Sequence, residues 1–197
     1  MTPSADPRLQ LAPPGGQASF WLFALAFVLP VAITTTAVLM PVLGGSPLKL
    51  IGGSLALTLA ASLGGIALLC GALWWGLSRL MWRQALELSA DALDVRSSFY
   101  HCRTPLAELK LDQARVVDLD EHTELKPILK ANGFSIPGFR SGWFVLRNRR
   151  RSFVAVADGR RKLWLPGHGK HDLLLEPRDP AALLARLREL AAVPGRR

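Results

Sequence analysis

The stretch GWFVLRNRRRSFVAVADGRRKLWLP, residues 142–166, contains three runs typical of β-strands, separated by two clusters of positive charge. Aromatic and β-branched residues fill the runs, as strands prefer. Asp158 and Gly159, between the second and third runs, are a two-residue hairpin signal. The stretch therefore predicts consecutive antiparallel strands in which aromatic and basic residues lie close together.

A hairpin at Asp158 and Gly159 would decide which residues share a face of the sheet. Phe153 is then expected opposite Trp164, because directly opposed residues lie on the same face. That face also carries Lys162 and Arg160. The opposite face is the predicted core face, with Val154, Val156, Leu163 and Leu165.

An aromatic pair flanked by cations suits the headgroup region of a membrane, where Trp lies at the interface and Lys or Arg meets phosphate. The candidate membrane-contact residues are Arg149, Arg150, Arg151, Arg160, Lys162, Phe153 and Trp164. In the alternative interpretation another element covers the aromatic pair. The cations then only solvate a strand edge and discourage pairing with other chains.

Further strand patterns lie on both sides of this stretch. Upstream, LELSADALDV, residues 86–95, alternates as two half-buried strands around a turn, and a polar loop is expected over residues 121–141. Downstream, EPRDPAALLARLRELAA has a helical period, with Asp179 as N-cap, Pro180 at the first helical position and one leucine stripe. We expect about seven antiparallel strands in a curled sheet or barrel, capped by this C-terminal α-helix.

Two long apolar runs precede the β region. Residues 20–43 and residues 50–78 contain no charged side chain, and about 20 apolar residues suffice to cross the bilayer core. We predict a membrane-spanning helix over each, with Pro30 and Pro41 bending the first. The first run is too long for a cleaved signal peptide. The short connection between the runs allows only a tight hairpin, so both chain ends lie on one side.

The distribution of positive charge sets the orientation of the hairpin. Lys49 is the only cation of the connection, whereas Arg8 precedes the first helix and Arg79 and Arg83 follow the second. Excess Lys and Arg mark cytoplasmic flanks, so both termini are expected in the cytoplasm. The net charge of +9 is typical of proteins that meet nucleic acid or anionic membranes, and the tether favours anionic lipid over nucleic acid.

Small residues recur every four positions in the second helix, which allows another helix to approach closely. They are Gly52, Ala56, Ala60 and Gly64. The short connection favours the first helix as the mate of this strip. A second copy of the chain is the alternative, which would make the protein a homo-oligomer.

Candidate catalytic groups are few. His168, His171 and Asp172 in GHGKHD are residue types that bind zinc, but a third or fourth ligand from elsewhere is missing, and the segment is typical of a hairpin loop. His101 and Cys102 are adjacent on a strand, so their side chains point to opposite faces. No phosphate-binding glycine loop or nucleophile elbow occurs. We therefore expect no catalytic residues, no metal and no cofactor.

Three blocks follow the two apolar runs in order: LELSADALDVRSSFYHCRTPLAEL, LKPILKANGFSIPGFRSGWFVL and LLLEPRDPAALLARLREL. This arrangement resembles the bacterial pleckstrin-homology-like (PH-like) membrane proteins over roughly residues 85–190. The resemblance implies a PH-like barrel at the bacterial inner membrane, with no established catalytic residues. Asp91 and Asp94 lie where lipid-phosphate-binding PH domains carry Lys and Arg, so inositol-phosphate recognition there is not implied.

The sequence thus predicts a membrane-anchored, non-enzymatic binding or scaffolding module that contacts anionic lipid, an unknown protein partner, or both. The alternatives are a membrane enzyme with a metal at the 168–172 loop and an accessory subunit of a transport or envelope complex. The expected parts are a disordered tail over residues 1–19, the two helices within 20–78, a PH-like β domain over 85–191 and a basic tail over 192–197.

Overall fold

The computed structural model describes residues 6–44, 53–169 and 171–192. The chain divides into two compact units: residues 1–18 together with 81–197, and residues 19–80. The first is a mainly β domain with a C-terminal helix, and the second is a pair of long helices.

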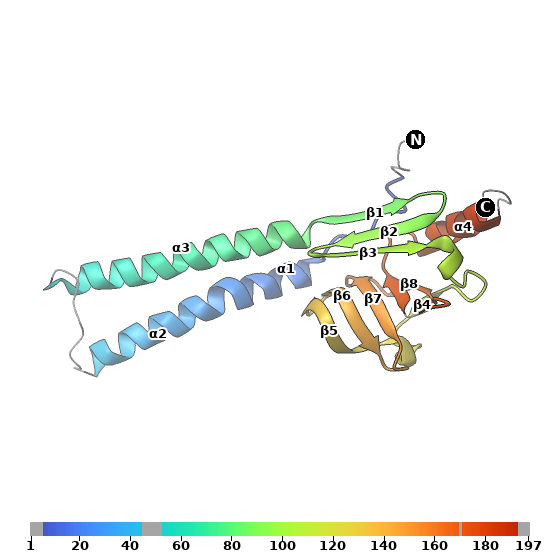
Figure 1. The fold of residues 1–197 in the computed structure, drawn as a ribbon. Helices are drawn as coiled ribbons and strands as arrows, with labels where there is room; N and C mark the ends of the chain where they lie inside the picture. Colours follow the sequence, from blue (N-terminus) through green and yellow to red (C-terminus); the bar gives the residue numbers. More distant parts are fainter. Residues whose placement is uncertain (1–5, 45–52, 170, 193–197) are drawn as a thin grey trace. The chain divides into compact units, whose positions relative to one another are not determined.

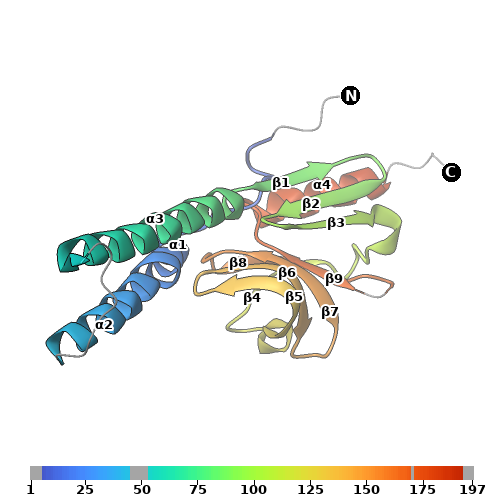
Figure 2. The same ribbon diagram turned by 60° about the vertical axis from the view of Figure 1, so that its left-hand side comes forward.

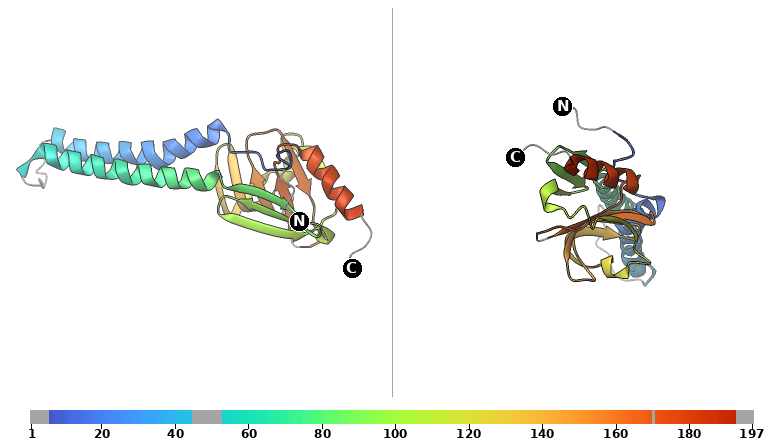
Figure 3. Two further views of the ribbon diagram at one scale, coloured as in Figure 1. Left: turned by 90° about the horizontal axis from the view of Figure 1, so that it is seen from above. Right: turned by 90° about the vertical axis from the view of Figure 1, so that its right-hand side faces the viewer.

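The two long helices run side by side (Figure 3). Both are long and apolar enough to cross a membrane, which confirms the expected pair of apolar helices. The predicted start of the second run, including Gly52, lies outside the described residues. The helical segments are α1 (Gly16–Phe23), the π-helical η1 (Ala24–Val28), α2 (Leu29–Leu43) and α3 (Leu55–Met81).

The π-helical segment η1 shows how the first helix accommodates a proline. Pro30 donates no backbone N–H, and its ring crowds the carbonyl four residues earlier, at Ala26. Ala26 lies in η1, where the wider π turn relieves that crowding. Pro41, by contrast, lies inside the regular α-helix α2.

Aromatic side chains pack the two helices together. Phe23 meets Trp74 edge to face with ring centroids 5.4 Å apart, and Phe27 stacks on Phe23 at 5.2 Å. Gly71 of α3 lies beside this cluster, since a Cβ at that position would lie 3.7 Å from the Phe27 ring, in ordinary van der Waals contact. The described contact between the helices is therefore aromatic.

The described residues of the β domain form nine strands in two open sheets (Figures 1 and 2). The strand orders are β1-β2-β3 and β4-β8-β9-β7-β6-β5. The expectation of about seven strands is corrected, and neither sheet closes into a barrel. The strands are β1 (Gln84–Leu88), β2 (Ala92–Ser97), β3 (Tyr100–Pro105), β4 (Arg115–Asp118), β5 (Pro127–Ile136), β6 (Phe139–Leu146), β7 (Arg151–Val156), β8 (Arg161–Leu165) and β9 (Asp172–Leu175).

Strand β5 occupies residues 127–136 of the polar loop predicted over residues 121–141. It is an edge strand paired only with β6, and most of its side chains are exposed. Exposure on both faces removes the alternation of apolar and polar residues by which a strand is recognised. The single-turn 3-10 helices η3 (Leu106–Glu108) and η4 (Thr123–Leu125) lie in the connections from β3 to β4 and from β4 to β5.

The predicted hairpin between β7 and β8 does not form, because β9 lies between them. Phe153 of β7 pairs with Leu173 in parallel, and Leu173 pairs with Leu165 of β8 in the antiparallel sense. Phe153 therefore shares a face with Leu165, while Trp164 lies on the other face with Val154. All four residues of β9 are buried, and this burial outweighs a two-residue turn signal.

Two apolar cores lie on opposite faces of the six-stranded sheet. The larger joins this sheet to the three-stranded sheet and to α4 (Pro180–Ala192), and it contains Phe153 and Leu183, both fully buried. The smaller contains Phe144, Leu146 and Val154. The central strands are therefore buried on both faces.

The C-terminal helix α4 begins as the sequence predicts. Oδ1 of Asp179 accepts hydrogen bonds from the backbone N–H groups of Ala181 and Ala182, at 3.1 and 3.0 Å. Leu183, Leu184 and Leu187 are buried in the larger core. The helix is therefore part of the domain core.

The described residues before α1 belong to the β domain. Leu9 and Leu11 are buried in the larger core, and the side-chain amide of Gln10 makes two hydrogen bonds of 3.1 Å with the backbone of Leu86. The disordered tail predicted for the N-terminus is wrong for residues 6–18. Proline and polar residues suggested disorder there, but Leu9, in a turn, and Leu11, in a β-bridge with Pro177, anchor the segment.

Candidate functional site

The two basic clusters lie at opposite ends of strand β7. Residues 147–150 form the turn before β7, and residues 157–160 form the loop after it. A strand rises about 3.3 Å per residue, so six residues separate the clusters by roughly 20 Å. The predicted contact residues therefore do not form one patch.

Lys162 is buried in an internal ion pair. Its side chain is 6% exposed, as is that of its partner Glu176. The ammonium group also donates to the carbonyl oxygens of Ala157, at 2.9 Å, and Gly159, so all three of its protons have acceptors. Glu176 in turn accepts the backbone N–H groups of Ala157 and Gly159 at 2.8 Å each. The pair closes the β7–β8 loop and leaves no Lys162 donor for a headgroup.

Arg150 also has an internal partner. Its Nε and Nη2 donate to the two carboxylate oxygens of the fully buried Asp172, at 2.8 and 2.6 Å. Nη2 also donates to the carbonyl oxygen of Gly167 at 3.2 Å. The hydrogen bond that the Arg150 guanidinium donates to Asp172 raises the pKa of Arg150, against the opposing effect of burial. Arg150 thus clamps the 167–172 loop.

The aromatic pair of the sequence is divided between the two faces. Phe153 is fully buried, and Trp164 is half-buried under the guanidinium of Arg115, 5.2 Å from its ring centroid. Arg151 lies over a different ring, that of Trp143, at 5.3 Å. Phe153 therefore has no surface that lipid could reach.

The exposed cations in and next to the two clusters include Arg147, Arg149, Arg160 and Arg161. Arg149 is exposed in the turn before β7, with a positive φ of 66°. Arg160 is 85% exposed and lies 3.7 Å from Asp118, and Arg161 is exposed at the start of β8. Surface pairs of this kind are weak, so Arg160 stays available to another anion.

The β7–β8 loop lies beside the residue that precedes α1. A Cβ on Gly15 would clash with the carboxylate of Asp158, and so would a Cβ on Gly138, whose φ is 80°. The two glycines therefore allow the N-terminal segment, the β5–β6 turn and the β7–β8 loop to meet. The first membrane-length helix starts at the next residue, Gly16.

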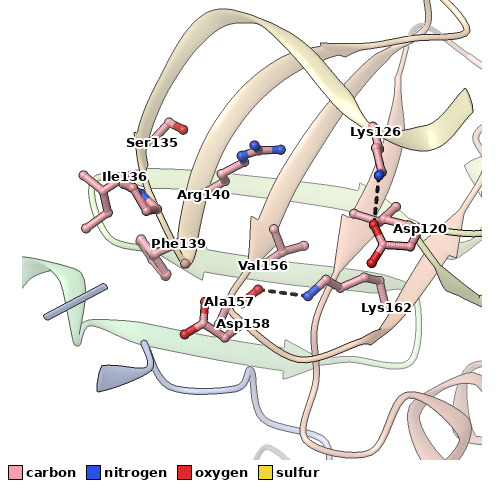
Figure 4. A pocket seen from close by; sticks show the side chains of 13 residues that line it. Asp120, Lys126, Ser135, Ile136, Phe139, Arg140, Val156, Ala157, Asp158 and Lys162 are labelled. Atoms are coloured by element: carbon pink, nitrogen blue, oxygen red, sulfur yellow. Dashed lines mark hydrogen bonds and ion pairs between the residues drawn. The ribbon is translucent and has the colours of Figure 1, made fainter. Parts of the chain in front are cut away.

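A pocket of about 700 Å³ opens at the same loop (Figure 4). Lys126 and Asp120 in its wall form an ion pair of 2.8 Å, and the hydrogen bond from Lys126 lowers the pKa of Asp120. Arg140 donates to the carbonyl oxygen of Pro127 at 3.5 Å, a long and therefore weak hydrogen bond. The apolar part of the lining consists of Leu119, Ile136, Pro137, Phe139, Val156 and Ala157.

The sequence did not predict this pocket, although Lys162 in its wall was a candidate contact residue. The lining residues come from the β4–β5 connection, the β5–β6 hairpin, the end of β7 with the loop that follows it, and β8. No spacing in the chain connects them, since β5 itself was predicted as a loop. Only the curl of the six-stranded sheet brings them together.

The histidine that lies beside Cys102 in the structure is His171, not the adjacent residue His101. His171 Nε2 lies 3.8 Å from Cys102 Sγ, and Thr104 Oγ1 lies 3.5 Å from both atoms. His101 instead contacts Asp94 at 2.8 Å. Burial raises the pKa of the Cys102 thiol, which disfavours the thiolate that a nucleophile needs. The cluster is therefore a poor candidate for covalent catalysis.

The candidate zinc ligands also diverge. Asp172 is bonded to Arg150, and His171 faces Cys102. Among the described residues, no group of three or more His, Cys, Asp or Glu side chains is placed to hold a metal ion.

The small-residue strip of α3 is exposed at its described positions. Ala56, Ala60 and Gly64 are exposed, and no heavy atom lies within 4 Å of a Cβ built on Gly64. The first helix contacts α3 near Gly71 instead. The favoured mate of the strip is therefore not observed at these three positions.

No family model, curated protein or solved structure matches this chain. The resemblance to PH-like membrane proteins therefore stays a prediction. The protein combines two helices that could span a membrane with an open, two-sheet β domain and a C-terminal helix.

Proposed function

We propose that the protein is a non-enzymatic, PH-like binding module anchored in the bacterial inner membrane, with its β domain held at the cytoplasmic leaflet. Short, hydrogen-bonded connections to both helices support this function. Ala12 N donates to Glu176 O at 2.7 Å shortly before α1 begins, and β1 begins at Gln84, just after α3 ends at Met81. Such tethers keep one end of the domain close to the bilayer.

The position of the β7–β8 loop carries the proposal of lipid contact. Asp158 packs against Gly15, the residue before α1, so Arg160 and Arg161 belong to the end of the domain from which that helix departs. Arg83 follows α3 directly and adds a third cation. Each cation near an anionic surface contributes about 1 kcal/mol, which for three is enough to favour one orientation. The residues before β7 are not part of this contact.

Nanodiscs of defined lipid composition test the contact with the full chain. The variant Arg160→Gln/Arg161→Gln is compared with Arg147→Gln/Arg149→Gln, which removes two exposed charges at the other end of β7. Hydrogen exchange of the β7–β8 loop should slow on anionic lipid at low salt in the wild type and the control variant, but not in the first variant. Salt should weaken the protection. Equal exchange on anionic and zwitterionic lipid in the wild type would exclude leaflet contact.

The pocket favours a second binding role, capture of a small anion or of an acidic side chain from a protein partner. Lys126 and Lys162 each have a carboxylate partner, whereas the contact described for Arg140 is with a carbonyl oxygen. Its guanidinium therefore retains donors for a carboxylate or phosphate. Acetate and inorganic phosphate are the probes, and either should raise the melting temperature of the wild type but not of Arg140→Gln. No shift with either probe would remove small anions as ligands.

A metal-dependent enzyme at the 168–172 loop remains the alternative from a different class. The Arg150–Asp172 pair counts against it, because a carboxylate held by two charge-assisted hydrogen bonds is a poor metal ligand without rearrangement. Metal analysis of the purified full chain separates the two proposals. Stoichiometric zinc that is lost in His168→Ala would overturn the non-enzymatic one. Crosslinking in native membranes would identify a transport or envelope complex.

A further inference from the structure

Two exposed aromatic side chains gather at one end of the three-stranded sheet. Trp82 is 56% exposed and Phe99 is 53% exposed. Among the described residues of the β domain, the other large apolar side chains this exposed are Ile128 and Leu129 on the edge strand β5. Two of these four exposed apolar side chains, Trp82 and Phe99, therefore lie close to the end of α3.

Phe99 occupies the tip of the β2–β3 hairpin. Ser97 pairs with Tyr100, so Ser98 and Phe99 form a two-residue turn, and Ser98 has a positive φ of 54°. Such turns favour Asn, Asp or Gly. The Phe99 ring meets Tyr100 edge to face, with ring centroids 6.4 Å apart, but 53% of Phe99 stays exposed, and that surface would gain free energy if an apolar environment covered it.

The tip is fastened to the segment that follows α3. Ser98 N donates to Arg83 O at 2.9 Å, and Ser97 pairs with Gln84. Figure 1 shows the β2–β3 turn beside the start of β1. Because α3 ends at Met81, the turn lies only a few residues' length from the membrane-length helix. This proximity follows from the hydrogen bonds and the chain connection.

The ends of the helices carry residues typical of a membrane interface. Trp75 is 60% exposed, and the guanidinium of Arg79 lies 5.3 Å from its ring centroid. Phe20 on the first helix is 64% exposed. Aromatic rings and Arg gather at the level where hydrocarbon meets headgroups. Trp82 continues this series beyond the end of α3.

We propose that Phe99 and Trp82 insert into the interfacial region of the bilayer that the helices span, making the β2–β3 tip a second membrane contact. Ser141 Oγ donates to Ser97 O at 2.8 Å, which joins the tip to the six-stranded sheet. Insertion of the tip thus fixes the orientation of the whole domain. The inference rests on the proposed membrane anchoring but not on anionic lipid, because the inserted groups are apolar.

A spin label at position 99 tests the insertion. Phe99→Cys is compared with Ala90→Cys, an exposed position in the β1–β2 turn at the other end of the same sheet. Both natural cysteines, Cys70 and Cys102, are buried and are replaced by alanine in both variants. The full chain is placed in zwitterionic nanodiscs, and collisions with oxygen, which partitions into lipid, are compared with those of a water-soluble nickel chelate.

The label at position 99 should collide several-fold more with oxygen than with the nickel chelate, and the label at position 90 should show the reverse. Equal accessibility to the nickel chelate at both positions overturns the proposal. Failure of the chain to enter nanodiscs would instead contradict the membrane anchoring. If anionic lipid does not slow hydrogen exchange of the β7–β8 loop while the label at position 99 lies in lipid, only the proposed contact of Arg160 and Arg161 is contradicted.

A fluorescence measurement keeps the proposal testable if the cysteine variants do not fold. Phe99→Trp and Ala90→Trp each add one indole to the wild-type chain. Lipids with brominated acyl chains should quench most of the emission added at position 99 and little of that added at position 90. Unquenched added emission at position 99 would also overturn the insertion.

Discussion

Single residues around the two basic clusters are governed by buried carboxylates. Asp172 and Glu176 are almost completely buried; Asp172 pairs with Arg150 from the turn before β7, and Glu176 pairs with Lys162 of β8. An unpaired buried carboxylate is far more costly than an exposed arginine left in water. Arg150 and Lys162 are therefore structural, and the exposed arginines remain for external contacts.

The Lys162–Glu176 pair should be needed for stability. Lys162→Met leaves the Glu176 carboxylate buried without its cation and should lower the free energy of unfolding by about 3–5 kcal/mol. Urea denaturation of the full chain in detergent, followed by tryptophan fluorescence, measures it. Arg160→Gln, at an 85% exposed side chain, should change it by less than about 0.5 kcal/mol. A stable Lys162→Met variant would show that Glu176 is satisfied without Lys162.

The Cys102 thiol should react slowly while the domain is folded. Burial raises its pKa, so the folded state holds the proton to higher pH than the unfolded state, in which thiols titrate near about 8.5. The thiol's contribution to stability is therefore complete below the unfolded pKa and is lost as pH rises through the folded pKa. Maleimide labelling of Cys70→Ala from pH 7 to 10 measures this. A folded-state rate that titrates at or below the unfolded value would contradict it.

Among the elements, the strand partners of β9 and the packing of the N-terminal segment depart furthest from the sequence prediction. β9 lies between β7 and β8. In the N-terminal segment, Gln10 hydrogen-bonds to Leu86 of β1, and Ala12 hydrogen-bonds to Glu176, the residue after β9. Both segments are stabilised by burial against residues remote in sequence. Local turn and composition signals do not contain that information.

The N-terminal segment should contribute to the stability of the β domain. Leu11→Ala removes a buried side chain, 4% exposed, and should lower the free energy of unfolding by about 2–4 kcal/mol. Arg8→Ala, at an exposed position in the same segment, is the matched control and should be nearly neutral. Equal stability of wild type and Leu11→Ala in urea would mean that the segment is not packed in solution.

At the scale of the whole molecule, the chain consists of two membrane-length helices with a short connection and a β domain. The β domain is built from the segments on both sides of the helix pair. The domain includes residues before the first helix and residues after the second. Both flanks must therefore lie on one side of the membrane for this domain to form. Leu11, before the first helix, and Leu86, after the second, pack in one core, so the two flanks must lie on the same side whatever the distribution of Lys and Arg.

A reporter fusion should confirm that side as the cytoplasm. Green fluorescent protein fused after Arg197 should fluoresce in bacterial cells, and alkaline phosphatase at the same position should be inactive, because Lys and Arg accumulate on cytoplasmic flanks. Alkaline phosphatase inserted in the 45–49 connection should be active. The reverse pattern would place the β domain in the periplasm.

The sequence by itself determined the segments whose signal is local. Apolar length defined the two helices, and the Asp179 cap with its leucine stripe defined α4. The strand character of residues 143–146 and 162–165 was likewise correct, because aromatic and β-branched runs favour extended backbone.

Only the tertiary structure decided strand neighbours, faces and partners. Because β9 lies between β7 and β8, Phe153 faces the larger core and Trp164 lies on the opposite face of the sheet. The buried carboxylates of Asp172 and Glu176 pair with Arg150 and Lys162, which are therefore not available for external contacts. The pocket around Arg140 and the anchoring of Phe99 beside Arg83 likewise join distant residues. The physical reason is that burial and ion pairing depend on which segments meet, and residues far apart in the chain settle that.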